Sequence, residues 1–170
     1  LGSLDWIPNQ EGLIWFLNQV WPTVLEKYPS IKFHVAGRNT PRSIAERLKG
    51  ETGVIFHGEV DSAQNYLKNY SIVVVPILSG SGMRVKIVEG MMLGKAIITT
   101  AIGLEGIDAA NREQVIVADK PNDFAKAIIE IIQRPDLKVS IAEKARIFAM
   151  ENFDNSALTK RLETFYKQLI

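Results

Sequence analysis

The chain has 170 residues, of which 46% are hydrophobic and 23% are charged, and this is the composition of one soluble globular domain with a full core. Twenty Lys and Arg residues against nineteen Asp and Glu residues leave a formal charge of +1, so the charge balance predicts no nucleic-acid partner. Cysteine is absent, which excludes disulfides and thiolate metal sites, and two histidines argue against a zinc site. The most continuous apolar run, 72–78, is far shorter than the roughly 20 residues that cross a bilayer.

Apolar residues alternate between strand-like and helix-like patterns along the whole chain, which is typical of βαβ units. We therefore expect one α/β domain over 1–170, with a Rossmann-like open parallel sheet of about six strands and helices on both faces. In chain order the sequence predicts a strand at 1–4, a helix at 9–28, a strand at 32–36, a helix at 41–49, a strand at 54–57, a helix at 62–69, a strand at 72–75, a helix at 82–93, strands at 96–99 and 114–117, and helices at 122–133, at about 136–151 and at 156–169. Since residues 1–4 look like the tail of a strand and no Met or leader precedes them, we also expect a fragment of a longer protein.

Several glycines follow the predicted strands within a few residues. They are Gly2, Gly37, Gly58, Gly80 and Gly103. In an open parallel sheet the carboxyl ends of the strands form the edge at which ligands bind. The loops that follow the strands are therefore the place to look for a binding site.

The segment 72–95 is the most informative part of the chain. A buried strand runs into a Ser/Gly loop that opens a helix, so free backbone N–H groups and the positive end of the helix dipole converge on one spot. This arrangement suits a phosphate. The segment is not a P-loop, because no Gly-Lys-Ser/Thr follows, and it is not the dinucleotide fingerprint, because Val85 stands at the third glycine position.

The helix predicted at 82–93 is apolar almost all the way round, apart from a narrow stripe that holds Lys86 and Glu89. At the carboxyl edge of a sheet, such a stripe can set an ammonium against a phosphate and a carboxylate against a ribose diol. The alternative is an ordinary ion pair between side chains three residues apart on a partly exposed helix. The stripe alone leaves both interpretations open.

The order and spacing of several short motifs resemble the C-terminal, donor-binding half of a family 4 glycosyltransferase of GT-B fold (glycosyl transferases group 1). The resemblance covers essentially the whole chain, and the motifs that carry it are at 2–9, 35–38, 56–60, 75–76, 80–89 and 94–100. It implies that Glu89, which matches the second Glu of the family's paired glutamates, binds the ribose hydroxyls of a nucleotide-sugar donor. It also implies that the loop after the third strand, with Gly58 and Val60, offers backbone groups to the nucleobase. Arg38 follows a strand at the ligand edge and is expected to face the nucleobase or the phosphates, the alternative being a solvated arginine at the strand end.

The chain departs from the family pattern in three ways. Ser81 stands where the family has its first Glu, which grips the donor sugar. The loop at 3–10 lacks the Arg and Lys that hold the diphosphate in the family, and we expect Arg84 and Lys86 to take over that role. The N-terminal domain that binds the acceptor is absent, so no catalytic residue is assigned, and His34 and His57 are interpreted as structural. The residues expected around the donor sugar and its phosphates are Ser3, Ser81, Gly82, Met83, Arg84 and Lys86.

The resemblance predicts the donor-binding domain of a retaining, metal-independent glycosyltransferase of bacterial surface polysaccharide or glycoconjugate synthesis, inactive as an isolated domain. The substrate is a nucleotide-diphosphate sugar, with UDP or GDP favoured, and no cofactor is expected. The other expected partner is the chain's own N-terminal domain, in a cytoplasmic enzyme that could reach the inner membrane only through that half. Two alternatives stay open: a GT-B nucleotide-sugar epimerase or phosphorylase, and a degenerate transferase domain that acts as a non-catalytic partner.

Overall fold

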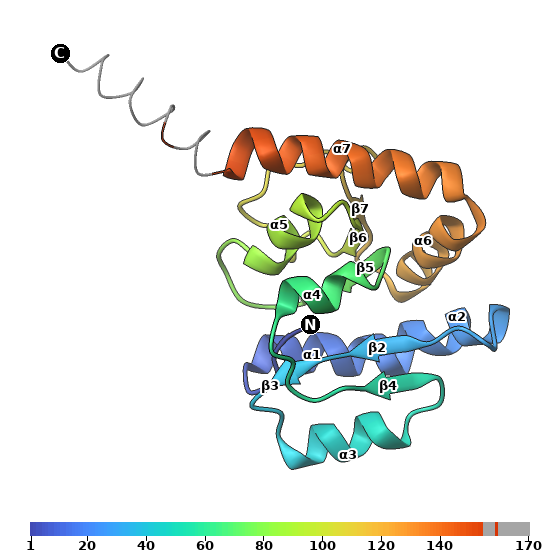
Figure 1. Ribbon diagram of the computed structural model, residues 1–170. Coiled ribbons are helices and arrows are strands. Elements are labelled where there is room, and N and C mark those ends of the chain that lie inside the picture. The colour runs from blue at the N-terminus through green and yellow to red at the C-terminus, as the bar shows by residue number, and fades with distance from the viewer. Residues whose placement is uncertain (155–158, 160–170) are drawn as a thin grey trace.

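The computed structural model describes residues 1–154 and 159, and helices surround short parallel strands in it (Figure 1). The helix expected at 156–169 lies, apart from Thr159, outside the described residues. The strands are β1 (Gly2–Ser3), β2 (Phe33–Val35), β3 (Gly37–Arg38), β4 (Val54–Phe56), β5 (Ile72–Val75), β6 (Ala96–Thr99) and β7 (Ile116–Val117). The helices are α1 (Ile7–Trp15), the π-helical turn η1 (Phe16–Val20), α2 (Trp21–Lys27), α3 (Arg42–Gly50), α4 (Ala63–Lys68), α5 (Val85–Met92), α6 (Pro121–Gln133) and α7 (Pro135–Phe153).

All strand pairs are parallel in the part of the chain that the structure describes, which confirms the α/β class. The expected single sheet is divided into three hydrogen-bonded groups, β1 with β3, β2 with β4, and β5 with β6 and β7. The strand predicted at 32–36 is β2, and after Ala36 the chain forms a further short strand, β3, which pairs with β1 and not with β4. The described residues therefore form seven strands where six were expected.

The helix predicted at 9–28 begins at Ile7 and is interrupted by η1. Pro22 explains the interruption. Its nitrogen has no hydrogen to donate to the carbonyl four residues earlier, and its ring crowds that carbonyl, so the preceding turn widens. After η1 the chain continues as α2, with the proline in its first turn.

The helix predicted at 82–93 begins three residues later than expected, at Val85. Gly82 has φ +90°, which lies outside the right-handed helical region, and Arg84 is extended with φ −89° and ψ 92°. Gly82, Met83 and Arg84 therefore belong to the loop. The helix begins at Val85, and the N–H of Ile87 in its first turn donates to the carbonyl oxygen of Arg84 at 2.8 Å.

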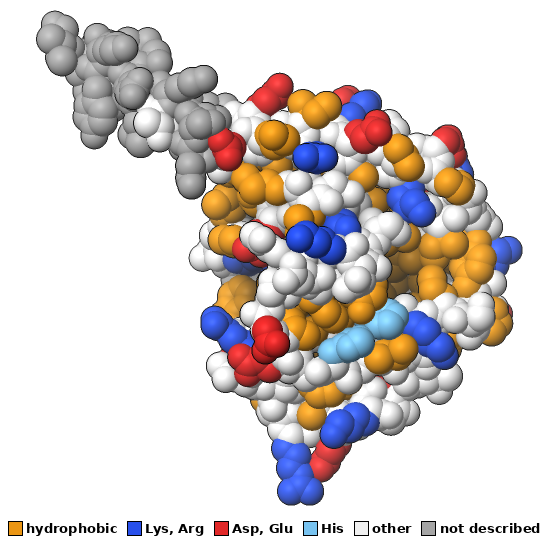
Figure 2. Space-filling view, viewed as in Figure 1, with side chains coloured by type: hydrophobic (Ala, Val, Ile, Leu, Met, Phe, Trp, Pro, Cys, Tyr) orange, Lys and Arg blue, Asp and Glu red, His pale blue; other side chains and the backbone are white. Residues whose placement is uncertain are grey.

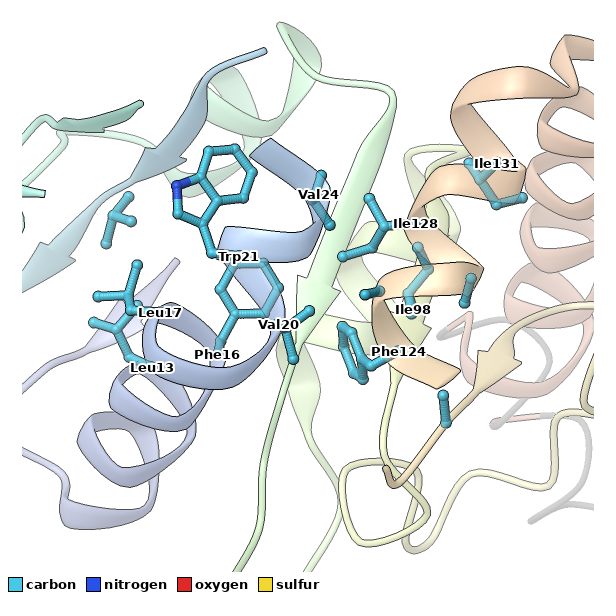
Figure 3. Packing of buried hydrophobic residues seen from close by; sticks show 14 of the residues in the cluster. Leu13, Phe16, Leu17, Val20, Trp21, Val24, Ile98, Phe124, Ile128 and Ile131 are labelled. Carbon is cyan, nitrogen blue, oxygen red and sulfur yellow. The ribbon is translucent and has the colours of Figure 1, made fainter. Parts of the chain in front are cut away.

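The larger hydrophobic cluster lies around Phe16, where η1 meets α6 (Figure 3). The Phe16 ring lies 4.7 Å from that of Phe33 and 6.0 Å from that of Phe124, so it joins β2 to α6. A second cluster lies between α5, β6 and α7 and includes Ile87, Met91 and Ala145. Together the two clusters hold the carboxyl ends of β1 and β5 beside the start of α5.

Gly12 fixes how α1 sits on the end of β5. A Cβ built at Gly12 would lie 1.9 Å from the carbonyl oxygen of Pro76, which is backbone and cannot turn aside. We predict that Gly12→Ala lowers the free energy of unfolding by about 2–4 kcal/mol. The matched change is Gly50→Ala, because a Cβ at Gly50 meets nothing within 4 Å.

Gly50→Ala should be neutral or stabilise the chain by up to about 1 kcal/mol, since alanine is the better helix former. Urea denaturation of both variants and the parent measures the difference. Equal losses in the two variants would show that the approach of α1 to Pro76 is not a tight constraint.

Candidate anion-binding site

The loop that connects β5 to α5 is folded around the side chain of Arg84. Its Nη1 donates to the carbonyl oxygens of Ser81 at 2.7 Å and Gly82 at 2.8 Å, and its Nη2 lies 3.4 Å from that of Ser79. Gly80 and Gly82 have φ of +88° and +90°, which turns these carbonyls inward and favours glycine. Arg84 is only 6% exposed. Its first role is therefore to hold the loop in shape.

Arg84 also contacts the loop that follows β1. Its guanidinium lies 5.2 Å from the centre of the Trp6 ring, a cation–π distance. Its Nε is buried without a hydrogen-bond partner. No role was predicted for Trp6, although its position in the loop after a strand at the ligand edge was a signal.

Lys86 reaches from the first turn of α5 to the end of β1. Its Nζ donates to Oδ1 of Asn9 at 2.6 Å, while Nδ2 of Asn9 donates to the carbonyl oxygen of Ser3 at 2.7 Å. A Cβ built at Gly2 would lie 3.2 Å from the same Nζ. Lys86 thus brings a positive charge to the loop at 3–10, which has no Lys or Arg of its own. Asn9, the last residue of the motif at 2–9, makes this connection, and no role was predicted for it.

The ammonium of Lys86 is in an unfavourable environment. Burial, and then the positive charge of Arg84, lower the pKa of Lys86 to about 8. Its hydrogen-bond partner Asn9 is a neutral amide, which does not compensate the charge. A buried cation of this kind gains from a bound anion.

A second group of polar residues lies at the ends of β1, β3 and β4. Arg38 donates from Nε to Oγ of Ser3 at 2.7 Å, and the N–H of Gly37 donates to the carbonyl oxygen of Gly58 at 2.8 Å. Arg38 lies inside β3, whereas the sequence analysis placed it after a strand. Val60 follows on the same loop as Gly58 and is half-buried. The three residues expected at the nucleobase, Arg38, Gly58 and Val60, thus lie on segments adjacent to that of Ser3.

The remaining predicted residues lie on α5 and the loop before it. Lys86 and Glu89 are half-buried while Ile87 and Val88 are buried, which agrees with the polar stripe expected on this helix. Ser81 and Gly82 are exposed, and Met83 is 44% exposed. Val85, expected on the buried part of the helix, is 58% exposed because it is the first helical residue.

Two buried threonines fix the loop after β6 against the end of β5. Oγ1 of Thr99 donates to the carbonyl oxygen of Val75 at 2.8 Å, and Oγ1 of Thr100 donates to that of Ile77. The N–H of Gly103 in turn donates to Oγ1 of Thr100 at 3.0 Å. The sequence signal was two adjacent hydroxyls at the end of an otherwise apolar strand, and it was not used.

His34, on β2, and His57, which follows β4, form a pair. Nδ1 of His34 lies 2.9 Å from Nε2 of His57, and the His34 ring lies 4.7 Å from that of Tyr70. These contacts fit the structural interpretation. Among residues 1–154, no three His, Asp or Glu side chains gather to hold a metal ion. No described helix is long and apolar enough to cross a membrane.

The parallel strands with helices around them define an α/β domain, and two cations, Arg84 and Lys86, lie where α5 begins after β5. The sequence pattern of the family described as "Glycosyl transferases group 1" matches residues 1–134. The chain belongs to this family.

Three known proteins illustrate the similarity. An uncharacterized 44.6 kDa protein in the cps region of Klebsiella pneumoniae is 31% identical over 163 residues, which are 91% of this chain and 42% of that protein. The C-terminal domain of a glycosyl transferase group 1 family protein (LpcC) from Francisella tularensis has a TM-score of 0.73 at 20% identity, over 91% of this chain and 84% of that one. Anabaena HepE in complex with UDP has a TM-score of 0.78 at 13% identity, over 98% and 48%. The chain thus spans less than half the length of the Klebsiella and Anabaena proteins.

The lowered pKa of Lys86 makes stability depend on pH. Between about pH 8 and the usual lysine range the unfolded chain holds this proton and the folded chain has released it, so the free energy of unfolding rises with pH, by up to about 1.4 kcal/mol per unit. We predict that the rise between about pH 8 and 9.5 is smaller in Lys86→Met. Urea denaturation at several pH values measures the difference.

The control for this prediction is Lys126→Met, which removes an exposed ammonium from α6. It should keep the pH dependence of the parent. If Lys86→Met kept it too, the ammonium of Lys86 would be solvated rather than buried.

Proposed function

We propose that the chain is the donor-binding domain of a retaining, metal-independent glycosyltransferase, and that its anion site holds the diphosphate of a nucleotide sugar. The observation that carries the proposal is the half-buried ammonium of Lys86, which faces a neutral amide at the junction of β1 and α5. Lys86 lies in the first turn of α5, at the positive end of the helix dipole. A ligand with two adjacent phosphates can use both features.

The proposed chemistry breaks the bond between the anomeric carbon of the sugar and the terminal phosphate oxygen. The electron pair of that bond stays on the diphosphate, while an acceptor hydroxyl forms the new bond to carbon and gives its proton to the departing phosphate oxygen or to a base of the N-terminal domain. Lys86 and the start of α5 stabilise the charge on the departing diphosphate, which is the role that a divalent metal plays in other transferases. Arg84 contributes its charge from behind the loop and keeps the carbonyls of Ser81 and Gly82 turned away from the phosphate.

The other predicted residues are assigned around this position. Glu89, one turn after Lys86 on α5, accepts hydrogen bonds from the ribose hydroxyls. Arg38, Gly58 and Val60 form the side toward the nucleobase, and Ser3 is assigned to the side of the sugar and phosphates, where its carbonyl oxygen accepts from Asn9. Because Ser81 replaces the first glutamate of the family pattern, the sugar is held by the loop residues Ser81, Gly82 and Met83. The catalytic acid or base comes from the N-terminal domain of the longer protein.

The comparisons support a nucleotide sugar as the ligand. The Anabaena protein of the same fold has been solved with UDP and with UDP-glucose. We therefore expect a UDP-sugar before a GDP-sugar. The proposed setting is the cytoplasmic synthesis of bacterial surface polysaccharide or glycoconjugates, and the name of the Klebsiella relative, which refers to a cps region, supports it.

Calorimetric titration of the full-length protein with UDP, GDP and ADP, in EDTA and then in magnesium, tests the proposal. We predict that one nucleotide binds equally well in both buffers, and that Lys86→Met weakens it by about 10- to 100-fold through the loss of a charge-assisted hydrogen bond. Glu89→Gln should weaken the nucleotide by about 10-fold but leave inorganic pyrophosphate unaffected. Comparing the nucleotide with pyrophosphate in Glu89→Gln separates binding of the ribose from binding of the phosphates.

Lys126→Met and Glu143→Gln are the matched controls, because both side chains are exposed on α6 and α7. They should bind like the parent. Binding that requires magnesium, or that survives Lys86→Met, would contradict the proposed site. Failure of every nucleotide to bind the full-length protein would favour the degenerate domain, for which the loss of the glutamate at Ser81 is the supporting observation.

A further inference from the structure

The loop that follows β6 lies directly against the end of β5. The hydroxyls of Thr99 and Thr100 both donate to backbone carbonyls of the segment that ends β5. Gly103 is packed between these groups, since a Cβ built there would lie 2.1 Å from Oγ1 of Thr99 and 3.2 Å from the carbonyl oxygen of Val75. The loop after β6 is therefore fixed beside the loop that connects β5 to α5.

Gly106 brings the loop after β6 into contact with Met83, in the loop before α5. A Cβ built at Gly106 would lie 3.4 Å from Cβ of Met83 and 3.6 Å from both its Cα and its backbone nitrogen. Gly106 has φ +78°, a left-handed conformation that favours glycine. The two loops thus meet at this point with no side chain of Gly106 between them.

Glu105, the residue before this contact, carries its side chain on the outside of the loop. Leu104 and Ile107, on either side, pack against the hydrophobic cluster between α5, β6 and α7, and Ile107 is buried. Glu105 is exposed, and Met83 is 44% exposed. A carboxylate therefore stands at the surface next to the residue that precedes Arg84.

The carboxylate of Glu105 has no hydrogen bond or ion pair within residues 1–154. Most of the charged surface is different. Figure 2 shows acidic and basic side chains interspersed over the face that it draws. Glu46, Glu51 and Glu130 each pair with an arginine. Glu105 is free to accept hydrogen bonds from a ligand.

The loop before α5 needs hydrogen-bond acceptors from a neighbouring segment if it holds a sugar. A sugar brings several hydroxyl donors. The carbonyl oxygens of Ser79, Ser81 and Gly82 are turned inward to Arg84. A hydroxyl that leaves water without finding an acceptor weakens binding. The segment that touches Met83 can supply the acceptor.

Glu11, on α1, is a second carboxylate at this loop, but it is already engaged. Its Oε2 accepts from Oγ of Ser79 at 2.7 Å. Ser79 is also at the beginning of the loop, whereas Met83 is two residues before the first residue of α5. Of the two carboxylates, Glu105 is the one beside the end of the loop that leads to Lys86.

We propose that Glu105 accepts hydrogen bonds from two neighbouring hydroxyls of the donor sugar, and that it selects a sugar in which this vicinal diol is free. The inference rests on the proposed function, because it takes the diphosphate to lie at Lys86 and the start of α5. The two oxygens of a carboxylate can accept from both hydroxyls of a diol at once. Glu105 thereby supplies the negative charge that Ser81 does not.

Calorimetric titration of the full-length protein tests the role of Glu105. The probes are the one of UDP, GDP and ADP that binds the parent protein, and the glucose ester of that nucleotide. We expect Glu105→Gln to weaken the glucose ester by about 10- to 100-fold and to leave the free nucleotide within about twofold, because only the ester brings hydroxyls to the carboxylate.

The 3-deoxyglucose ester of the same nucleotide sharpens the test. Every vicinal diol of the glucose ring includes the hydroxyl at carbon 3, so this analogue has none. It should bind the parent protein more weakly than the glucose ester does. Glu105→Gln should then weaken it by less than about threefold, since the paired hydrogen bonds are already lost.

Glu113→Gln is the matched control. Glu113 is exposed on the same segment between β6 and β7, and its carboxylate lies 4.0 Å from Nζ of Lys144. This variant should bind all three ligands like the parent. Thermal unfolding checks that Glu105→Gln is folded, and its melting temperature should equal that of the parent because the carboxylate has no partner among the described residues.

Different results would overturn the diphosphate site and the role of Glu105. If the nucleotide binds and needs Lys86, but Glu105→Gln binds the glucose ester like the parent, the diphosphate site stands and Glu105 has no part in holding the sugar. Equal weakening of the ester and the free nucleotide would also overturn its role, since the carboxylate would then act on the loop. If no nucleotide binds, the proposed function fails and the role of Glu105 fails with it.

Discussion

A positive charge held inside the protein by a neutral partner is the feature on which the site depends. Lys86 extends from α5 to Asn9, and Asn9 is bound to the carbonyl of Ser3 at the end of β1. The bond joins two segments 77 residues apart in the chain. The buried side chains of Ile87 and Met91 keep α5 in place, and their packing offsets the unfavourable burial of the ammonium. The site therefore exists before any ligand arrives.

The two cations of this region have different roles, although the sequence presents them as a pair. Arg84 donates to carbonyls of its own loop and lies near Trp6, so it determines the path of the chain before α5. Lys86, two residues later, faces the end of β1. The division follows from the start of the helix at Val85: Arg84 belongs to the extended loop and Lys86 to the first turn.

Much of the fold could be predicted from the sequence, because apolar periodicity reports burial directly. The strands at 72–75 and 96–99 were predicted with the bounds that the structure has. The widened turn before Pro22 was not predicted, although its cause, the missing N–H of the proline, is local. The short strand β3 after Ala36 could not be predicted, since it depends on hydrogen-bond partners far away in the chain. The role of Asn9 could not be predicted for the same reason, because it depends on β1 ending beside α5. Lys86 and Glu89 could be found because helical spacing is local.

The direct test of the central claim is a crystal structure of the full-length protein with UDP bound. The account predicts a diphosphate oxygen within about 3 Å of Nζ of Lys86, with the N–H groups of the first turn of α5 as further donors and the ribose at Glu89. A diphosphate bound elsewhere, with Lys86 still on Asn9 alone, would contradict it.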